Sequence, residues 1–316
     1  MLRHWPGRSF TGYLWVMRGM NAQVGAILML AVLASCAPAE EVSAPPTGDR
    51  HLRVATFNVH YLWRGADTAV ARWEPRGAAV VTLLSEIDAD LVAFQEMETF
   101  SGSSYNRENR QMDTLSAAFP DFGFAATGDP REYPNTQPIM FRRSKLTPLE
   151  QGFFFFSPQP QELYSAPWFG RFPSFGTWAR FRRHAESGDA GNSTILVFNV
   201  HIDRERYRNQ LRSARLVAEQ VNALRRPEEP VLVFGDFNAL RFMAPVRIVT
   251  REAGLQAAKG IGATFHFYRG LHLFPAIDHI LYGERWELKD ARAVRMRPGG
   301  VWPSDHYPVM ADLYFQ

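Results

Sequence analysis

Residues 231–238 read VLVFGDFN, and this segment is the most informative one about the architecture. Its apolar residues occupy both alternating sets of positions, which is typical of a strand covered on both faces. The segment ends in Asp236 and Asn238, whose side chains favour turns and can bind metal ions or phosphate. We therefore expect a buried strand that brings polar side chains to one edge of a sheet.

Three other apolar runs end in the same way. VATFN finishes at Asn58, LVAFQE at Glu96 and ILVFNVH at His201. If these strands run in the same direction, their polar ends meet at one edge, and such a convergence of polar groups is a default candidate for an active site. A single strand-ending Asn or Asp could equally be a turn residue, so the prediction rests on the whole set.

Short apolar runs separated by turn residues predict ten strands in all, and segments with apolar spacing near 3.6 predict four helices. The helices are expected at Ala69–Ile87, Glu108–Phe119, Arg206–Leu224 and Ala244–Ala253. Because several strands are apolar on both faces, the helices must cover the outer faces of the sheets. The fold class is therefore α/β, a four-layer α/β sandwich in which two packed mixed β-sheets are flanked by helices. The expected strands are Leu52–Val59, Leu91–Phe94, Phe122–Ala126, Ile139–Phe141, Phe153–Phe156, Thr177–Phe181, Ile195–Val200, Val231–Phe234, Ile277–Leu281 and Val309–Leu313.

The N-terminal part of the chain has a different composition. Arg18 precedes an apolar stretch of 11 residues, Val24–Ala34, which suits a signal peptide and is shorter than the ~20 residues that span a bilayer. It ends in Leu-Ala-Ser-Cys36, which resembles the lipobox of bacterial lipoproteins, where the cysteine is acylated. Residues 1–16 do not suit a signal start, so we expect translation to begin at Met17 or Met20.

These features predict three segments. Residues 1–36 are expected to be the signal peptide, residues 37–50 a flexible linker, and residues 51–316 the catalytic domain. The lipid on Cys36 implies a membrane partner and a place in the bacterial cell envelope, either at the periplasmic face of the outer membrane or in secreted form. We expect a monomer.

Charge and cysteine content exclude several classes of protein. Cys36 is the only cysteine of the sequence, so an intramolecular disulfide, a CxxC redox pair and a cysteine-rich zinc site are all excluded. The chain has 35 basic and 32 acidic residues, and the signal segment contributes three of the arginines, which leaves 35 − 3 = 32 basic residues. This balance differs from that of a globally basic nucleic-acid-binding protein.

Two Asp-His pairs complete the set of candidate site residues: Asp278-His279 and Asp305-His306. In chain order the motifs are TFN, QE, HID, GDFN, ID and SDH. This series resembles the endonuclease/exonuclease/phosphatase superfamily, which has the DNase-I-like form of the four-layer sandwich, and the resemblance covers roughly residues 52–314. It implies a divalent-metal-dependent hydrolase of phosphoester bonds, in which a metal- and Asp-assisted water attacks phosphorus in line.

The expected cofactor is Mg²⁺ or Mn²⁺, because carboxylate and amide oxygens are hard ligands. Glu96 is the expected principal metal ligand, helped by Asn58 and Asp305. Asp236 and Asn238 share parity and would face one way in an extended segment. The resemblance assigns Asp236 to the water and Asn238 to the water or the phosphate.

Two histidines have expected catalytic roles. His306 would donate to a phosphate oxygen while Asp278 fixes its tautomer. His201 resembles the family's other phosphate-contacting histidine, although it could instead be a satisfied core residue.

The sequence leaves the substrate open. A nuclease, a phospholipid phosphodiesterase and a phosphatase all fit, so the phosphoester partner is a nucleic acid, a phospholipid or a small molecule. The aromatic segment Phe153–Phe181 is expected to be mostly core, and any exposed part of it could stack on bases or enter a membrane interface. A non-catalytic binding lipoprotein is an alternative of another class. A zinc hydrolase ranks last, since the sequence has no HExxH motif.

Overall fold

The computed structural model describes residues 42–46, 48, 50–63, 73–100, 109–170, 172–184 and 194–316. All of these residues belong to one compact unit, Ala39–Gln316. Cys36 and the signal segment lie outside the described residues, so the lipidation site and the division of the chain into three segments stay predictions. In the predicted linker, the backbone oxygen of Ser43 accepts a hydrogen bond of 2.7 Å from Arg53 Nη1 in the first strand.

The first sheet contains six strands in the order β13-β14-β1-β3-β6-β5. β1 lies between β14, to which it is antiparallel, and β3, to which it is parallel. The first strand along the chain therefore pairs with the last one. The strands are β1 (His51–Asn58), β3 (Leu91–Gln95), β5 (Phe122–Ala125), β6 (Ile139–Arg142), β13 (Trp286–Ala293) and β14 (Val309–Phe315).

The second sheet also contains six strands, in the order β11-β12-β10-β9-β8-β7. β10 is parallel to β9 and antiparallel to β12. A small separate sheet pairs β2 (Leu62–Trp63) with β4 (Thr99–Phe100). The strands of the second sheet are β7 (Leu146–Phe155), β8 (Phe175–Arg183), β9 (Thr194–His201), β10 (Val231–Asp236), β11 (Gln256–Ala257) and β12 (Asp278–Tyr282).

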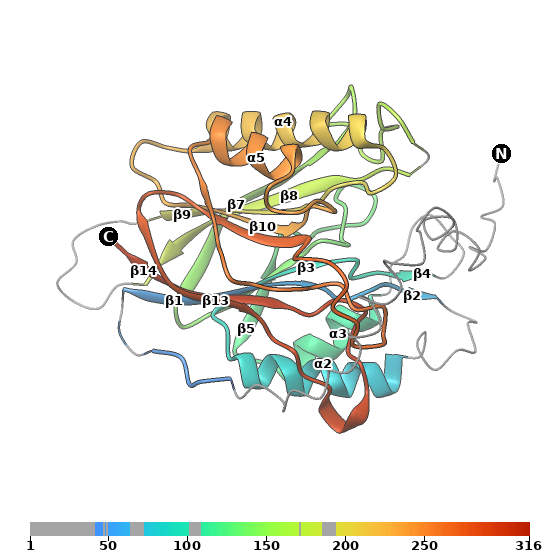
Figure 1. Cartoon of the computed structure of the whole chain (residues 1–316). Coiled ribbons are helices and arrows are strands. Elements are labelled where there is room, and N and C mark those ends of the chain that lie inside the picture. Colours follow the sequence, from blue (N-terminus) through green and yellow to red (C-terminus); the bar gives the residue numbers. More distant parts are fainter. Residues whose placement is uncertain are drawn as a thin grey trace, which may run out of the picture. The chain divides into compact units, whose positions relative to one another are not determined.

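The two sheets pack face to face, and helices cover their outer faces (Figure 1). One apolar core fills the space between the sheets, a second lies between the first sheet and helices α2 (Trp73–Ile87) and α3 (Arg110–Ala118), and a third lies between the second sheet and helices α4 (Tyr207–Leu224) and α5 (Ala244–Glu252). This arrangement confirms the predicted four-layer α/β sandwich. A short 3₁₀ helix, η2, spans Pro298–Gly300.

Alternation along β1 shows why the strands are apolar on both faces. Leu52 and Val54 point into the core between the sheets, whereas Ala55 and Phe57 point into the core under α2 and α3. Both sets are buried, so each strand needs apolar residues at odd and even positions. Asn58 shares the parity of Leu52 and Val54, and it therefore lies at the end of the inter-sheet space.

The predicted elements match the observed ones at their apolar positions and differ elsewhere. The strand expected at Phe153–Phe156 is the last part of β7, whose first half is largely exposed, and β13 was not predicted. Helix α3 begins at Arg110, where the side chain of Asn109 accepts a hydrogen bond of 3.1 Å from Met112 N. Among the described residues, no helix combines the length and apolar character needed to cross a membrane.

Candidate active site

The parallel and antiparallel pairings bring the strand-ending polar residues to one edge of the sandwich. In the second sheet, Asp236 pairs in register with His201 on β9 and with Asp278 on β12. In the first sheet, Asn58 pairs with Gln95 on β3, directly before Glu96. Each of the two sheets thus supplies part of one polar cluster.

Asp236 lies at the centre of this cluster and is almost completely buried, with 1% of its surface exposed. Its Oδ1 atom accepts a hydrogen bond of 2.8 Å from Asn238 N. Its Oδ2 atom accepts one of 3.1 Å from Asn58 Nδ2, and lies 3.6 Å from His201 Nε2 and 3.9 Å from His306 Nε2. Burial, and next the negative charge of Asp278, raise the pKa of Asp236 to about 6.

His306 is held by Asp278 through a hydrogen bond of 2.9 Å between Nδ1 and Oδ2. Burial opposes protonation of the imidazole, but the charges of Asp278, Asp236 and Asp305 outweigh it and raise the pKa of His306 to about 10. The ring is therefore an imidazolium at neutral pH. Its Nε2 atom remains directed at the cluster that contains Asp236.

Glu96 follows β3 in a left-handed conformation, with φ 56°. Its Oε1 atom accepts a hydrogen bond of 3.3 Å from Asn58 Nδ2 and lies 3.9 Å from His201 Nε2. Its Oε2 atom is buried and has no hydrogen-bond partner in the described part of the chain. Burial raises the pKa of Glu96, but the charges of His201 and His60 outweigh burial and lower it, so the group is a carboxylate.

Asp305 is placed by the Ser304 hydroxyl, which donates a hydrogen bond of 2.7 Å to Asn58 O and accepts one of 3.2 Å from His306 N. This ties the loop before β14 to the end of β1. The pKa of Asp305 is lowered, because the charges of His60 and His306 outweigh burial, which acts to raise it. All three predicted metal ligands thus lie on neighbouring segments.

The side-chain amides of Asn238 and Asn58 are oriented differently from what the sequence predicted. β10 ends at Asp236 and Asn238 adopts φ 47°, so the segment is not extended and the parity argument does not apply. Asn238 Nδ2 donates a hydrogen bond of 2.9 Å to Ile202 O, which braces the loop after β9. Asn58 Oδ1 accepts from His60 N at 3.1 Å, and its Nδ2 group faces the carboxylates. The roles of both amides in catalysis stay predictions.

The structure adds a group that the sequence did not indicate, formed by His60, Tyr268 and Arg76. His60 Nδ1 is hydrogen-bonded to the Tyr268 hydroxyl, which accepts a hydrogen bond of 2.8 Å from Arg76 Nη1. Arg76 Nη2 also donates to His60 O at 3.0 Å. The hydroxyl can either donate its proton to Nδ1 or accept a second hydrogen bond from Nδ1–H, and in both cases it holds the His60 ring in place.

Backbone strain is concentrated around this cluster. His60, Glu96, Asn238 and Tyr268 are non-glycine residues with φ between 47° and 57°. Such conformations cost free energy and persist where the surrounding structure enforces them, often at functional sites. In the sequence TFNVH, His60 lies two positions after Asn58. This spacing is the feature by which the sequence could have suggested His60.

The residues present fit a divalent cation. Ligand atoms of Asp236, Asp278 and His306 also lie within 4.8 Å of one another, but a protonated His306 has no lone pair for a metal ion, so these three form a hydrogen-bonded group beside the cation site. Two buried carboxylate oxygens, Glu96 Oε2 and Asp278 Oδ1, have no hydrogen-bond partner, and such oxygens are costly unless a cation or water neutralises them. Oxygen-rich surroundings of this kind suit a hard cation such as Mg²⁺ or Mn²⁺.

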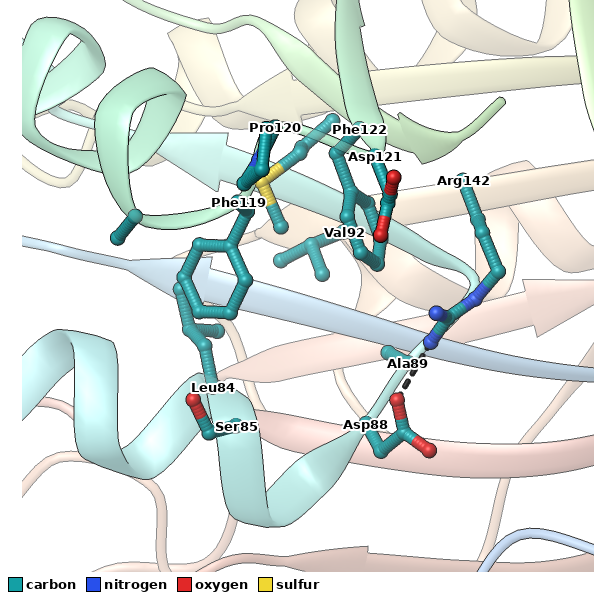
Figure 2. A pocket seen from close by; sticks show the side chains of 12 residues that line it. Leu84, Ser85, Asp88, Ala89, Val92, Phe119, Pro120, Asp121, Phe122 and Arg142 are labelled. Carbon is teal, nitrogen blue, oxygen red and sulfur yellow. Dashed lines mark hydrogen bonds and ion pairs between the residues drawn. The ribbon is translucent and has the colours of Figure 1, made fainter. Parts of the chain in front are cut away.

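A separate cavity of ≈ 260 Å³ lies at the other end of the first sheet (Figure 2). Its apolar wall includes Val92, Phe119 and Phe122, and the Arg142 side chain at its rim is paired with Asp88. Val92 lies at the start of β3, whereas Glu96 follows the end of that strand. The cavity is therefore not part of the polar cluster.

Comparisons with known proteins point to the same kind of chemistry. The sequence profile described as "Endonuclease/Exonuclease/phosphatase family" matches residues 55–306. No curated protein matches the chain.

Several solved structures resemble this chain in fold. An endonuclease/exonuclease/phosphatase family protein from Bacteroides thetaiotaomicron is 23% identical, with a TM-score of 0.70 over 86% of this chain and 99% of that one. A mannosyl-6-phosphatase from the same species is 23% identical, with a TM-score of 0.69 over 84% and 100%. TDP2 from D. rerio, complexed with single strand DNA product, is 14% identical, with a TM-score of 0.60 over 84% and 99%.

Proposed function

The chain belongs to the Endonuclease/Exonuclease/phosphatase family, and from this membership and the site geometry we propose that it is a divalent-metal-dependent hydrolase of phosphoester bonds. The observation that carries the proposal is the convergence on Asp236. Its Oδ2 atom faces Asn58 Nδ2, His201 Nε2 and His306 Nε2 within 3.9 Å, and these groups come from both sheets and the loop before β14.

Glu96 would hold the metal ion together with Asp305, and Asn58 would join them once its amide is turned so that Oδ1 faces the ion. The lowered pKa values of Glu96 and Asp305 keep both as carboxylates at neutral pH. When bound, Mg²⁺ or Mn²⁺ would supply positive charge for a phosphoryl oxygen and lower the pKa of a nearby water. The unpartnered Oε2 atom of Glu96 supports this assignment.

Asp236 is suited to orient and deprotonate the attacking water. Its pKa of about 6 lies closer to neutrality than that of an ordinary aspartate, so the ionised form is a stronger base and is still populated at pH 7. Asn238 N fixes Oδ1 and leaves Oδ2 facing the site.

His306 is suited to stabilise the negative charge that develops on the phosphate. As an imidazolium it can donate from Nε2 to a non-bridging oxygen while Asp278 holds Nδ1. His201, whose side chain is 25% exposed, lies across Asp236 and can donate to the same phosphate. The pair would enclose the phosphoryl group between two donors.

The test uses the purified unit Ala39–Gln316, which contains all three apolar cores. We expect turnover of bis-p-nitrophenyl phosphate or p-nitrophenyl phosphate with Mg²⁺ or Mn²⁺, loss of it with chelator, and loss of it in Glu96→Ala. Glu219→Ala on the exposed face of α4 is the matched control and should keep full activity. Folded protein that binds Mg²⁺ in a calorimeter yet hydrolyses neither ester, plasmid DNA nor phospholipid would contradict the proposal.

A second part of the proposal concerns location. The Leu-Ala-Ser-Cys36 sequence supports acylation of Cys36 and attachment of the enzyme to the outer face of a bacterial membrane. The full chain expressed in a bacterium should incorporate radioactive palmitate and fractionate with membranes, whereas Cys36→Ser should do neither. A soluble, unlabelled wild-type protein would refute the anchor. Light scattering of the unit Ala39–Gln316 tests the expected monomer.

A further inference from the structure

Large apolar side chains are exposed at one end of the described part of the chain. Six of the seven exposed large hydrophobic residues lie at the end of the sandwich that carries the candidate active site, five on connections and Tyr207 at the start of α4, and Leu149 on β7 is the exception. Their exposed fractions are Tyr164 41%, Phe169 37%, Tyr207 51%, Phe242 67%, Leu273 41% and Phe274 54%. Single exposed apolar residues are normal on a protein surface, but apolar residues gathered at one end and flanked by polar groups mark an interaction surface.

The topology explains why these residues surround the site. Phe242 follows Asn238 by four residues, Phe274 precedes Asp278 by four, and Tyr207 begins α4 directly after the loop that leaves His201. Tyr164 and Phe169 lie on the connection from β7 to β8. A Cβ atom at Gly170 in that connection would lie 3.5 Å from Asp203 Oδ2, so the connection lies against the loop after β9.

Arginines occupy the same loops. Segments 202–208, 239–243 and 266–276 contain five exposed arginines, Arg204, Arg206, Arg208, Arg241 and Arg269, against two acidic residues, Asp203 and Glu205. Residues 37–316 hold 35 − 3 = 32 basic and 32 acidic residues, so these three segments are more basic than the rest of the domain. The surface around the site therefore combines apolar tips with cationic flanks.

We propose that Tyr207, Phe242, Leu273 and Phe274, here called the apolar rim, dock the active site on an anionic phospholipid surface, so that the hydrolysed phosphoester belongs to a membrane lipid. The inference rests on the proposed hydrolase function and deepens it. The apolar tips enter the interface, and the flanking arginines stay at the level of the phosphate groups. The catalytic groups then lie four to six residues from the membrane-bound tips.

The composition of the apolar rim favours a lipid over a nucleic-acid strand. Bases bind by stacking on flat rings in a cationic groove. Leu273 has no ring, and it is adjacent to Phe274 in one exposed turn, which gives a contiguous aliphatic and aromatic tip suited to an acyl boundary.

The experiment measures cosedimentation of the unit Ala39–Gln316 with vesicles of phosphatidylcholine and phosphatidylglycerol. We expect binding by the wild type, and a partition coefficient at least about tenfold lower in Phe242→Ser/Leu273→Ser/Phe274→Ser. Leu149→Ser, which removes an exposed leucine elsewhere, should bind as the wild type does. Arg241→Glu/Arg269→Glu should lose binding to these vesicles and retain the residual binding to phosphatidylcholine alone.

Two controls separate this inference from the proposed function. The triple variant should hydrolyse soluble bis-p-nitrophenyl phosphate within about twofold of the wild type, since the apolar rim does not contact the reacting phosphate. Equal vesicle binding by the wild type and the triple variant overturns the inference, and so does binding to single-stranded oligothymidylate that depends on the apolar rim without vesicle binding. Loss of metal-dependent hydrolysis in the wild type would instead overturn the proposed function.

Discussion

At the scale of the residue, the structure gives Asp278 a role that is distinct from that of His306. The Asp278 carboxylate does not face the substrate side of the ring. It accepts a hydrogen bond from Nδ1 and is the largest of the attractions that outweigh burial and raise the pKa of His306 to about 10. We therefore infer that Asp278 is a positioning residue, whose effect on turnover would pass through the imidazole.

We expect Asp278→Asn to lower kcat by about 10- to 100-fold with little change in KM, because a neutral partner leaves His306 less charged and less firmly oriented. Steady-state kinetics of the single variants and of Asp278→Asn/His306→Gln measure the coupling. If Asp278 acts through His306, the double variant should be no slower than His306→Gln. Fully additive effects of the two substitutions would contradict this role.

A second prediction at the scale of the residue concerns the Tyr268 hydroxyl. Tyr268→Phe removes the partner of His60 Nδ1 and the acceptor of Arg76, so the His60 ring should lose its fixed orientation. We expect a decrease in kcat of about fivefold or more, and no further decrease when Tyr268→Phe is added to His60→Ala. Tyr282→Phe, at the far end of β12, is the matched control. An unchanged kcat in Tyr268→Phe would show that His60 needs no support.

At the scale of the element, β10 shows how the GDFN motif shapes the site. Gly235 has φ 144°, and a Cβ atom there would lie 1.9 Å from Val200 O on the neighbouring strand β9. The close approach of β10 to β9 places Asp236 beside His201. The close spacing of β9 and β10 therefore requires a glycine at position 235, whatever its role in catalysis.

Gly235→Ala should lower the free energy of unfolding by about 3 kcal/mol or more, since backbone atoms of β9 cannot move aside as a flexible side chain could. Urea unfolding followed by tryptophan fluorescence measures the loss. Gly283→Ala provides the comparison, because its nearest atoms lie 3.7 Å away and its φ is not positive. Equal unfolding midpoints for the two variants would contradict the steric argument.

Elements with continuous apolar runs were predictable from the sequence, and elements defined by tertiary contacts were not. β1, β9 and β10 are buried on both faces, so their composition alone indicates them. β13 reads WELKDARA and has only its terminal residues buried, so it becomes a strand through pairing with β14. The strand-ending site residues were found for the same reason, whereas His60, Arg76 and Tyr268 meet only through loops and a helix.

At the scale of the whole molecule, a polar bridge crosses the inter-sheet core beneath the site. Gln95 Nε2 on β3 donates to Asn199 Oδ1 on β9 at 2.6 Å, and Asn199 Nδ2 donates to Phe94 O at 2.7 Å. Both side chains are fully buried. This bridge fixes the two sheets relative to each other, and the site inherits its geometry from that fixed arrangement.

The stability of the whole domain should depend on His266, which is completely buried against Trp302 and Tyr307, with no partner for either ring nitrogen at hydrogen-bond geometry among the described residues. Burial lowers the pKa of His266 to about 4. Between pH 6.5 and 4 the unfolded chain binds a proton that the folded chain does not. Stability is therefore full above pH 6.5 and is lost as the pH falls towards 4, by up to about 3 kcal/mol.

His266→Phe should remove this contribution while preserving the stacking. Urea unfolding of both proteins at several pH values between 4 and 7 gives the slope of the unfolding free energy, which should be smaller in the variant. Parallel pH profiles would show that another group is responsible. The wild type and variant should be compared at constant ionic strength, since surface charges titrate in the same range.

The pairing of β1 with β14 has a consequence for how the protein is made. A ribosome releases β1 early, yet one edge of this strand stays without its partner until β14 follows. Ser304, which anchors the end of β1 to Asp305 and His306, lies 246 positions after Asn58. A nascent chain can therefore acquire neither a finished first sheet nor a working active site during most of its synthesis. If the proposed export holds, this delay would keep the polypeptide unfolded enough to pass through a translocation channel and would keep the proposed hydrolytic activity away from the cytoplasm.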